Sequence, residues 1–175
     1  MRESICCVTG PPLKALPGGK NERQPACLAL KARLKETLKQ MHGMGISALM
    51  TGLIPGADLW TAEALLEIQA ADPDFRMRLT CVLSSAEQTI LCPKERSARY
   101  CAVLRRANEV VCLSTLRYTG CARARNLYII SHSSRLIAVC GSAPGPDAYL
   151  LDYAQKCGLP IERVLLDSPA MKNVL

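Results

Sequence analysis

The chain has 175 residues and a mass of 19.0 kDa, which suits one globular domain with a sizeable core. Hydrophobic residues make up 49% of it and charged residues 21%, which excludes a disordered chain, and no apolar run approaches the roughly 20 residues of a membrane-spanning helix. The net charge of +7 indicates an anionic partner, either nucleic acid or a phosphorylated small molecule, although solvated helix faces would explain many basic side chains equally well.

Short apolar runs alternate with helical patterns along the whole chain. The predicted strands cover residues 5–9, 47–51, 76–83, 109–113, 135–140 and 163–166, and the predicted helices cover residues 24–42, 57–71, 94–107, 122–131 and 147–157. This alternation is typical of a parallel sheet covered on both faces. We therefore expect a single α/β domain over residues 1–175, a three-layer Rossmann-like fold with a mostly parallel sheet of about six strands flanked by helices.

Two segments refine this expectation. In the first predicted helix, apolar residues recur every three or four positions, at Leu30, Leu34, Leu38 and Met41, which predicts one buried face. The loop 11–23, rich in glycine, proline and lysine, has no such period, and we expect it to be the most mobile segment.

Three predicted strands end at glycine, at the sheet edge where ligands bind in open α/β folds. The residues concerned are Thr9 and Gly10 after the first strand, Thr51, Gly52 and Gly56 after the second, and Gly141, Ser142 and Gly145 after the fifth. Glycine lets a ligand approach the backbone closely, and the helix N-terminus that follows two of these loops attracts anions. The sequence therefore predicts a phosphate-type site. A P-loop is excluded, because Gly52 and Gly56 enclose three residues instead of four and Ala57 stands in place of the required lysine.

The start of the second predicted helix carries three side chains with two interpretations each. Asp58 and Glu63 would cap the helix or complement its dipole, or they would accept hydrogen bonds from ribose hydroxyls. Trp60, the sole tryptophan, would pack in the core or stack on a base.

The basic residues are concentrated between Lys94 and Arg135. This segment contains nine basic and two acidic residues, which gives it a net charge of +7. Within this window Tyr118 lies in the loop after the fourth strand, and Arg125 and Asn126 lie in the helix that follows. An arginine at this edge could bind a phosphate through two parallel hydrogen bonds. We therefore count these three among the expected ligand-binding residues.

Ten cysteines occur without any C-x-x-C pair, and the two histidines, His42 and His132, stand far apart in the sequence. Structural zinc sites usually bring their ligands in such pairs. We expect no metal site and interpret most of the thiols as small buried hydrophobes.

A series of short motifs spans nearly the whole chain. These motifs are Thr9-Gly10, Thr51-Gly52-x-x-x-Gly56-Ala57-Asp58-Leu59-Trp60-Thr61-Ala62-Glu63, Arg99-Tyr100, Tyr118, Arg125-Asn126 and Gly141. In this order they resemble the YpsA-like branch of the SLOG superfamily, known from bacteria and related to the Smf/DprA DNA-processing proteins and the LOG phosphoribohydrolases. The resemblance implies a Rossmann-like domain that binds a nucleotide or nucleotide-derived ligand such as NAD, ADP-ribose or an AMP-like molecule, with no cofactor required. It also implies one pocket wall from Gly52 to Glu63, a second from Arg125 and Asn126, and a second phosphate loop from Gly141 to Gly145.

Two departures from the family pattern bear on catalysis. The first Thr-Gly is followed by Pro11 and Pro12, where relatives commonly carry an aromatic or histidine and a basic residue. The loop 141–147 lacks the Gly-Gly pair, threonine and glutamate of the LOG enzymes, which leaves Asp147 as its one carboxylate. No catalytic residue is assigned. We expect a non-catalytic or weakly catalytic nucleotide-binding protein, with a nucleoside-monophosphate phosphoribohydrolase and a DprA-like single-stranded DNA-binding protein as alternatives.

The expected partners are a nucleotide-derived small molecule, single-stranded nucleic acid under the DNA-binding alternative, and a second copy of the chain. Leu127, Ile129 and Ile130 would form the apolar face of a homodimer, or they would belong to the core. The N-terminus has only four apolar residues after its charged start, which is too short for a secretory signal. We expect a cytoplasmic protein with no membrane partner.

Overall fold

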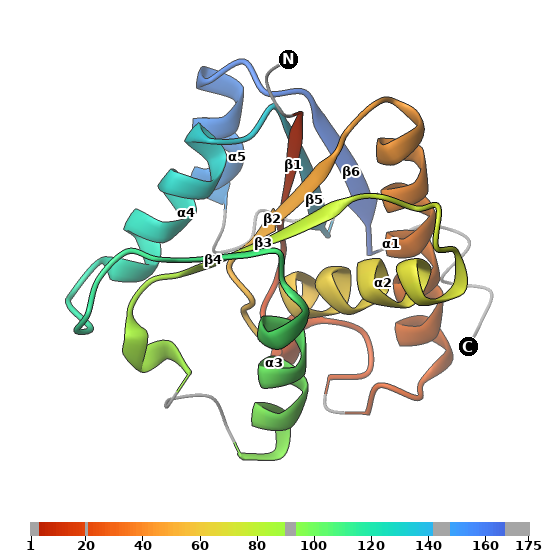
Figure 1. The fold of residues 1–175 in the computed structure, drawn as a ribbon, viewed down its shortest axis with the longest axis horizontal. Helices are drawn as coiled ribbons and strands as arrows, with labels where there is room; N and C mark the ends of the chain where they lie inside the picture. The colour runs from red at the N-terminus through yellow and green to blue at the C-terminus, as the bar shows by residue number, and fades with distance from the viewer. Residues whose placement is uncertain (1–3, 20, 90–93, 142–147, 167–175) are drawn as a thin grey trace.

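Six strands of the computed structural model pair in parallel into one sheet, in the order β4-β3-β2-β1-β5-β6 (Figure 1). The structure describes residues 4–19, 21–89, 94–141 and 148–166. The strands are β1 (Ile5–Thr9), β2 (Ala48–Thr51), β3 (Arg78–Leu83), β4 (Glu109–Cys112), β5 (Arg135–Cys140) and β6 (Ile161–Leu165). The helices are α1 (Pro25–Gly43), α2 (Ala57–Ala71), α3 (Lys94–Arg106), α4 (Cys121–Ser131) and α5 (Ala148–Lys156), with short 3-10 helices at Leu13–Ala15 and Ala86–Gln88.

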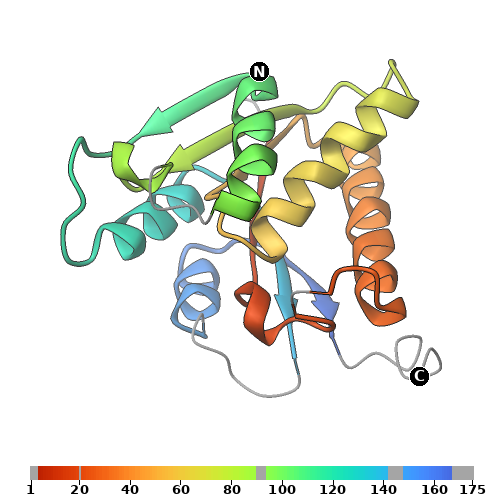
Figure 2. The same cartoon turned by 90° about the horizontal axis from the view of Figure 1, so that it is seen from below.

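Neighbouring residues on each strand face opposite layers, as the twofold period of a strand requires. On β1, Cys6 packs into the cluster beneath α1, α2 and α3, whereas Cys7 packs into the cluster beneath α4 and α5. Ile137 and Ala138 on β5 divide in the same way. Figures 1 and 2 show α1, α2 and α3 side by side on one face of the sheet and α4 and α5 on the other. The expected three-layer Rossmann-like fold is confirmed.

The helix α1 has the buried face that its spacing predicts. The side chains of Leu30, Leu34, Leu38 and Met41 are all fully buried. Proline occupies the first helical position, where its missing N–H costs nothing, because the first N–H groups of a helix have no partner within it. Burial of a leucine side chain stabilises a fold by roughly 1.5–3 kcal/mol, so this face anchors α1 to the sheet.

The strand order reverses direction at β1. Strands β2, β3 and β4 follow one another on one side of it, and β5 and β6 lie on the other. A crevice opens beyond the carboxyl ends of the strands at such a reversal. The chain leaves β1 through Gly10, where a Cβ atom would lie 2.5 Å from Cβ of Ala57 and 2.8 Å from Cβ of Val139. Gly10 therefore lets α2 and β5 approach each other at the reversal point.

The loop 11–23 has more structure than its sequence predicts. Its Leu13 and Leu16 are buried, and Leu13 N–H donates to the Pro55 carbonyl oxygen at 3.1 Å. Pro12 forms an isolated antiparallel bridge with Gly56. The loop therefore packs against the turn between β2 and α2, a long-range contact that no local pattern reveals.

The predicted elements occur in the predicted order, and their ends differ from the observed ends by two residues at most. Residue 147, the expected start of the last helix, lies outside the described residues. Among the described helices, none combines the length and the apolar character that crossing a membrane requires.

Candidate functional site

Two neighbouring pockets open at the carboxyl edge of the sheet, and Ile54, Ala122 and Arg125 border both. The first, which we call the β1 pocket, has a volume of about 360 Å³. The second, which we call the β3 pocket, has a volume of about 330 Å³. The β1 pocket is lined by Cys7, Val8, Thr9, Gly10, Pro12, Ile54, Asp58, Ala122, Arg125, Asn126, Ile129, Ile130, Leu136, Tyr149 and Leu150. The β3 pocket is lined by Leu53, Ile54, Pro55, Ser84, Ser85, Gln88, Tyr100, Arg117, Cys121, Ala122 and Arg125.

Arg125 is buried, with 3% of its surface exposed, between the two pockets. Its Nε and Nη2 donate to Oδ1 of Asn126 at 3.0 and 2.8 Å, and its Nη1 donates to Oε1 of Gln88 at 3.4 Å. Both acceptors are neutral amides, and no carboxylate of a described residue forms an ion pair with Arg125. A buried guanidinium is thus held by neutral partners at the mouth of two cavities.

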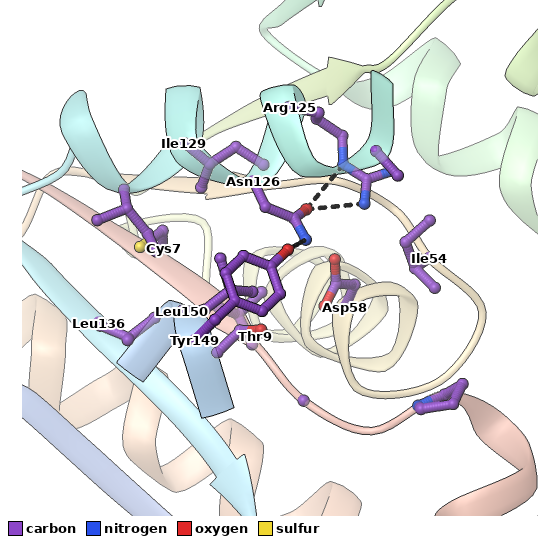
Figure 3. A pocket seen from close by; sticks show the side chains of 15 residues that line it. Cys7, Thr9, Ile54, Asp58, Arg125, Asn126, Ile129, Leu136, Tyr149 and Leu150 are labelled. Atoms are coloured by element: carbon purple, nitrogen blue, oxygen red, sulfur yellow. Dashed lines mark hydrogen bonds between the residues drawn. The ribbon is translucent and has the colours of Figure 1, made fainter. Parts of the chain in front are cut away.

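Asn126 connects Arg125 to α5 through a further hydrogen bond. Its Nδ2 donates to the Tyr149 hydroxyl at 3.2 Å, and Figure 3 shows the chain of hydrogen bonds from Arg125 through Asn126 to Tyr149. The guanidinium carbon of Arg123 lies 4.7 Å from the centre of the Tyr149 ring, a cation–π contact. Side chains from α4 and α5 therefore fix one wall of the β1 pocket.

The opposite wall comes from α2. The carboxylate of Asp58 projects into the β1 pocket from the first turn of this helix (Figure 3). The hydroxyl of Thr51, a fully buried residue, donates to the Asp58 carbonyl oxygen at 3.4 Å and accepts the Leu53 N–H at 3.2 Å. These bonds hold the turn between β2 and α2, in which Leu53 has the left-handed φ of +54°. A non-glycine residue in that conformation is uncommon and strained, and such residues cluster at active sites and ligand-binding sites.

Two glycines in this turn are required because other parts of the chain occupy the space that a side chain would need. A Cβ atom on Gly52 would lie 2.8 Å from Nε of Arg125, so the guanidinium occupies the space that a side chain would need. A Cβ atom on Gly56, whose φ is +126°, would lie 2.8 Å from the Pro11 carbonyl oxygen and 2.9 Å from Leu13 N. Gly52 thus leaves room for the side chain of Arg125, and Gly56 leaves room for the backbone of the loop after β1.

Gln88 accepts a hydrogen bond from Arg125 on the side opposite Asn126, and it belongs to no motif in the sequence. Its Oε1 accepts from the backbone N–H and the hydroxyl of Ser84 at 2.9 and 3.0 Å, and its Nε2 donates to the Gly52 carbonyl oxygen at 2.8 Å. This one amide joins the ends of β2 and β3 to the buried arginine. Sequence reasoning missed Gln88 and Tyr149, because neither belongs to a local pattern of known chemistry.

Trp60 and Glu63 line neither pocket. Trp60 is 2% exposed in the core, with Nζ of Lys31 at 4.8 Å from the centre of its ring. Of the two interpretations of Trp60, core packing describes its place in the structure. Glu63 accepts from Nε and Nη2 of Arg99 at 2.7 and 2.6 Å, on the outer side of α2.

Arg99 also binds Glu22 of the loop after β1. Its Nη1 and Nη2 donate to the two carboxylate oxygens of Glu22 at 2.7 and 3.0 Å, and Lys31 pairs with the same carboxylate at 2.5 Å. Burial opposes ionisation of Glu22, but the hydrogen bonds and charges of Arg99 and Lys31 outweigh it and lower its pKa to about 2. This network ties the loop 11–23 to α1, α2 and α3.

The remaining predicted site residues lie at the rim or outside the described part. Tyr118 is half exposed and lines neither pocket, although its carbonyl oxygen accepts the Cys121 N–H at 3.1 Å. Gly141 directly follows β5 and also lines neither pocket. Ser142, Gly145 and Asp147 fall outside the described residues. The structure therefore brings together Thr9, Gly10, Asp58, Arg125 and Asn126, with Thr51, Gly52 and Gly56 in the turn that supports them.

The thiols divide into two chemical classes. Burial raises the pKa of Cys6, Cys7 and Cys81 to about 12 in each case. Cys121 is different: a hydrogen bond with the Tyr118 backbone lowers its pKa from the ordinary value against the opposing effect of burial. Among the described residues, no three or more histidine, cysteine and acidic side chains gather as metal ligands would.

The basic residues between positions 94 and 135 do not form one surface. Arg99 is neutralised by Glu63 and Glu22, and Arg125 is buried. Arg106 ends α3 just before β4 begins, so it lies at the opposite edge of the sheet from Arg117 and Arg123. The isoleucines of the expected homodimer face, Ile129 and Ile130, are 4% and 2% exposed and pack against the sheet, so the core interpretation describes them.

The chain is similar in sequence to known proteins. A family model described as the YspA SLOG family (YpsA) matches residues 7–160. Similar curated proteins include UPF0398 proteins of Bacillus cereus (strain AH820) and Bacillus anthracis (strain A0248), each 27% identical over 142 residues that cover 79% of this chain and 76% of the relative.

Two solved structures of DNA processing protein A have a similar fold. The Helicobacter pylori protein, described in its single-stranded DNA binding mode, has a TM-score of 0.62 at 14% identity over 93% of this chain, and the Streptococcus pneumoniae protein has a TM-score of 0.59 at 12% identity over 91%. The chain spans 65% of the first protein and half of the second, and at these identities the likeness shows the fold alone. The match over residues 7–160, the motifs and the six-stranded fold together show that this chain belongs to the YspA SLOG family.

Proposed function

We propose that this protein binds a nucleotide or nucleotide-derived ligand, such as AMP, ADP-ribose or NAD, in the β1 pocket, with a phosphate of the ligand against Arg125. The single observation that carries the proposal is the buried guanidinium of Arg125 with neutral partners. A buried charge is costly unless an opposite charge or several hydrogen bonds compensate it, and a phosphate supplies both. Three of the five N–H groups of Arg125 have a described partner, which leaves two for a ligand.

The surroundings of Arg125 suit the other parts of a nucleotide. The N-terminus of α4 opens to both pockets at Ala122, and no acidic residue occupies its first turn, so its partial positive charge is available to a phosphate. Apolar side chains such as Ile129 and Leu150 would contact a base. Asp58 would accept hydrogen bonds from ribose hydroxyls. A volume of about 360 Å³ falls in the range of small-molecule pockets, about 300–1,000 Å³.

Titration calorimetry with AMP tests the proposal on three proteins. We expect wild type to bind AMP, Arg125→Ala to bind it at least about 100-fold more weakly, and Arg125→Lys to fall between them, because lysine keeps the charge but loses the two-pronged geometry. Arg105→Ala, an exposed arginine near the end of α3, is the control and should bind AMP as wild type does. Equal AMP affinity in Arg125→Ala and wild type would refute the proposal.

A second candidate function is single-stranded DNA binding, favoured by the fold shared with DNA processing protein A. Arg117 and Arg123 would contact phosphates at the carboxyl edge of the sheet. The division of the basic residues between two edges of the sheet, however, counts against a long continuous surface for DNA. Fluorescence anisotropy with a labelled oligonucleotide at two salt concentrations tests it, since affinity from phosphate contacts falls steeply with salt. Salt-sensitive DNA binding that AMP does not displace would favour this candidate over the first.

A further inference from the structure

We propose that the β3 pocket is a second subsite, which binds the distal phosphate of a nucleoside diphosphate, and any group attached to it, when the nucleoside lies in the β1 pocket. This inference rests on the proposed function and names its ligand class more narrowly. The two pockets are neighbours that share Ile54, Ala122 and Arg125. A diphosphate reaching across Arg125 would therefore pass from one pocket into the other without leaving the protein surface.

Ser85 is the polar group that points to a ligand in the β3 pocket. It is 1% exposed and lines the cavity, and its hydroxyl forms no hydrogen bond with any residue that the structure describes. Because Ser85 lines the cavity and its hydroxyl is not used within the described part of the chain, this hydroxyl can donate a hydrogen bond to a group in the pocket. A phosphate oxygen in the β3 pocket would accept this hydrogen bond.

The charge of the β3 pocket has the sign that a second phosphate needs. Arg117 lines it from the loop after β4, Arg125 closes it on the side of the β1 pocket, and no carboxylate of a described residue lines it. The N-terminal residues of α4, Cys121 and Ala122, form part of the wall, so the positive end of this helix faces the same space. The volume of about 330 Å³ exceeds that of a phosphate and leaves room for a group beyond it.

The first test compares AMP with ADP by calorimetry on wild type, Ser85→Ala and Arg117→Ala. We expect ADP to bind wild type about 10-fold more tightly than AMP, since charge-assisted hydrogen bonds of this kind are worth about that factor. Each substitution should remove most of that gain and leave the AMP affinity unchanged. Ser131→Ala and Arg105→Ala change an exposed serine and an exposed arginine outside both pockets, and they should retain the full gain.

The outcomes separate the two proposals. If AMP binds wild type and ADP binds no more tightly, or if the gain survives both substitutions, the second subsite is refuted and the proposed function stands. If neither nucleotide binds wild type, the proposed function fails and this inference fails with it.

A second measurement needs no variant and so does not depend on the folding of a mutant. Cys121 lines the β3 pocket, whereas Cys112 and Cys157 are exposed elsewhere and serve as internal references. We expect ADP-ribose, but not AMP, to slow alkylation of Cys121 by iodoacetamide several-fold while the two references react at unchanged rates. Peptide-resolved mass spectrometry follows each thiol, and protection of Cys121 by AMP alone to the same degree would overturn the assignment.

Discussion

The guanidinium of Arg125 lies against the α-carbon of Gly52, so close that a methyl group there would stand 2.8 Å from Nε. The two residues are 73 positions apart in the sequence, one after β2 and one in α4. The identity of residue 52 therefore controls the position of the buried cation that the proposed function requires.

Gly52→Ala should displace Arg125 and weaken AMP binding at least about 10-fold, because the neighbouring group that must move is a buried guanidinium held by three hydrogen bonds. Gly43→Ala is the matched control, since a Cβ atom there meets nothing within 4 Å. Calorimetry on both variants checks the prediction. If the two variants bind AMP equally well, Gly52 does not act through Arg125.

The network of Glu22, Arg99 and Lys31 predicts a loss of stability in acid. The pKa of Glu22 is lowered to about 2 in the folded protein, so its contribution is complete above the ordinary carboxylate pKa and is lost as the pH falls from about 5 towards 2. Solvent screening limits the contribution to about 1 kcal/mol.

Chemical denaturation at pH 7 and pH 3 measures this effect. Glu22→Gln should lower the free energy of unfolding at pH 7 and lower it by less at pH 3, where the carboxyl is protonated in the unfolded chain but still ionised in the folded protein. Glu36→Gln, which changes an exposed carboxylate of α1 with no ion pair to a described residue, should leave the pH dependence of wild type intact. A wild-type pH dependence in Glu22→Gln would show that the network contributes nothing.

Asp58 should let the protein recognise ribose hydroxyls. Its carboxylate is the one that the described residues place in the β1 pocket, and carboxylates accept hydrogen bonds from hydroxyl groups well. We expect wild type to bind AMP about 10-fold more tightly than 2′,3′-dideoxy-AMP, and Asp58→Asn to lose most of this discrimination. Equal binding of the two nucleotides by wild type would remove the assigned role.

Incubation with nucleoside monophosphates should release no free base. Hydrolysis of a glycosidic bond usually needs a pair of carboxyl groups, whereas Asp58 carries the single carboxyl group that the described residues place in either pocket. Chromatography of the reaction mixture measures the release. A base released by wild type and absent with Asp58→Asn would identify the protein as a phosphoribohydrolase instead.

Much of the fold follows from the sequence because its signals are local. The stripe Leu30 to Met41 and the apolar runs of the strands depend on neighbours within a few residues, and the structure has them as predicted. The sequence leaves two places open for Trp60, whereas the structure buries four consecutive residues of α2, Leu59, Trp60, Thr61 and Ala62. A helix buried on nearly every side leaves no rim position for a tryptophan.

The candidate site is less predictable, because its parts meet only in the folded chain. The sequence predicts that a ligand approaches the backbone at Gly52, yet the group that lies there is the side chain of Arg125. Gln88 joins Ser84, Gly52 and Arg125 through a single amide, and nothing in the sequence around Gln88 indicates this role. The orientation of long polar side chains depends on tertiary contacts that motif spacing does not encode.

The alternation of Cys6 and Cys7 between the two core layers has a consequence for refolding. Folded, these neighbouring thiols face opposite sides of the sheet, and their raised pKa keeps them protonated and unreactive. Unfolding releases them together with the other buried cysteines into water, where thiolates form and mispaired disulfides become accessible. Heating without a reductant should therefore trap the chain, and recovery after cooling will depend on whether thiols stay reduced as much as on the stability of the native state.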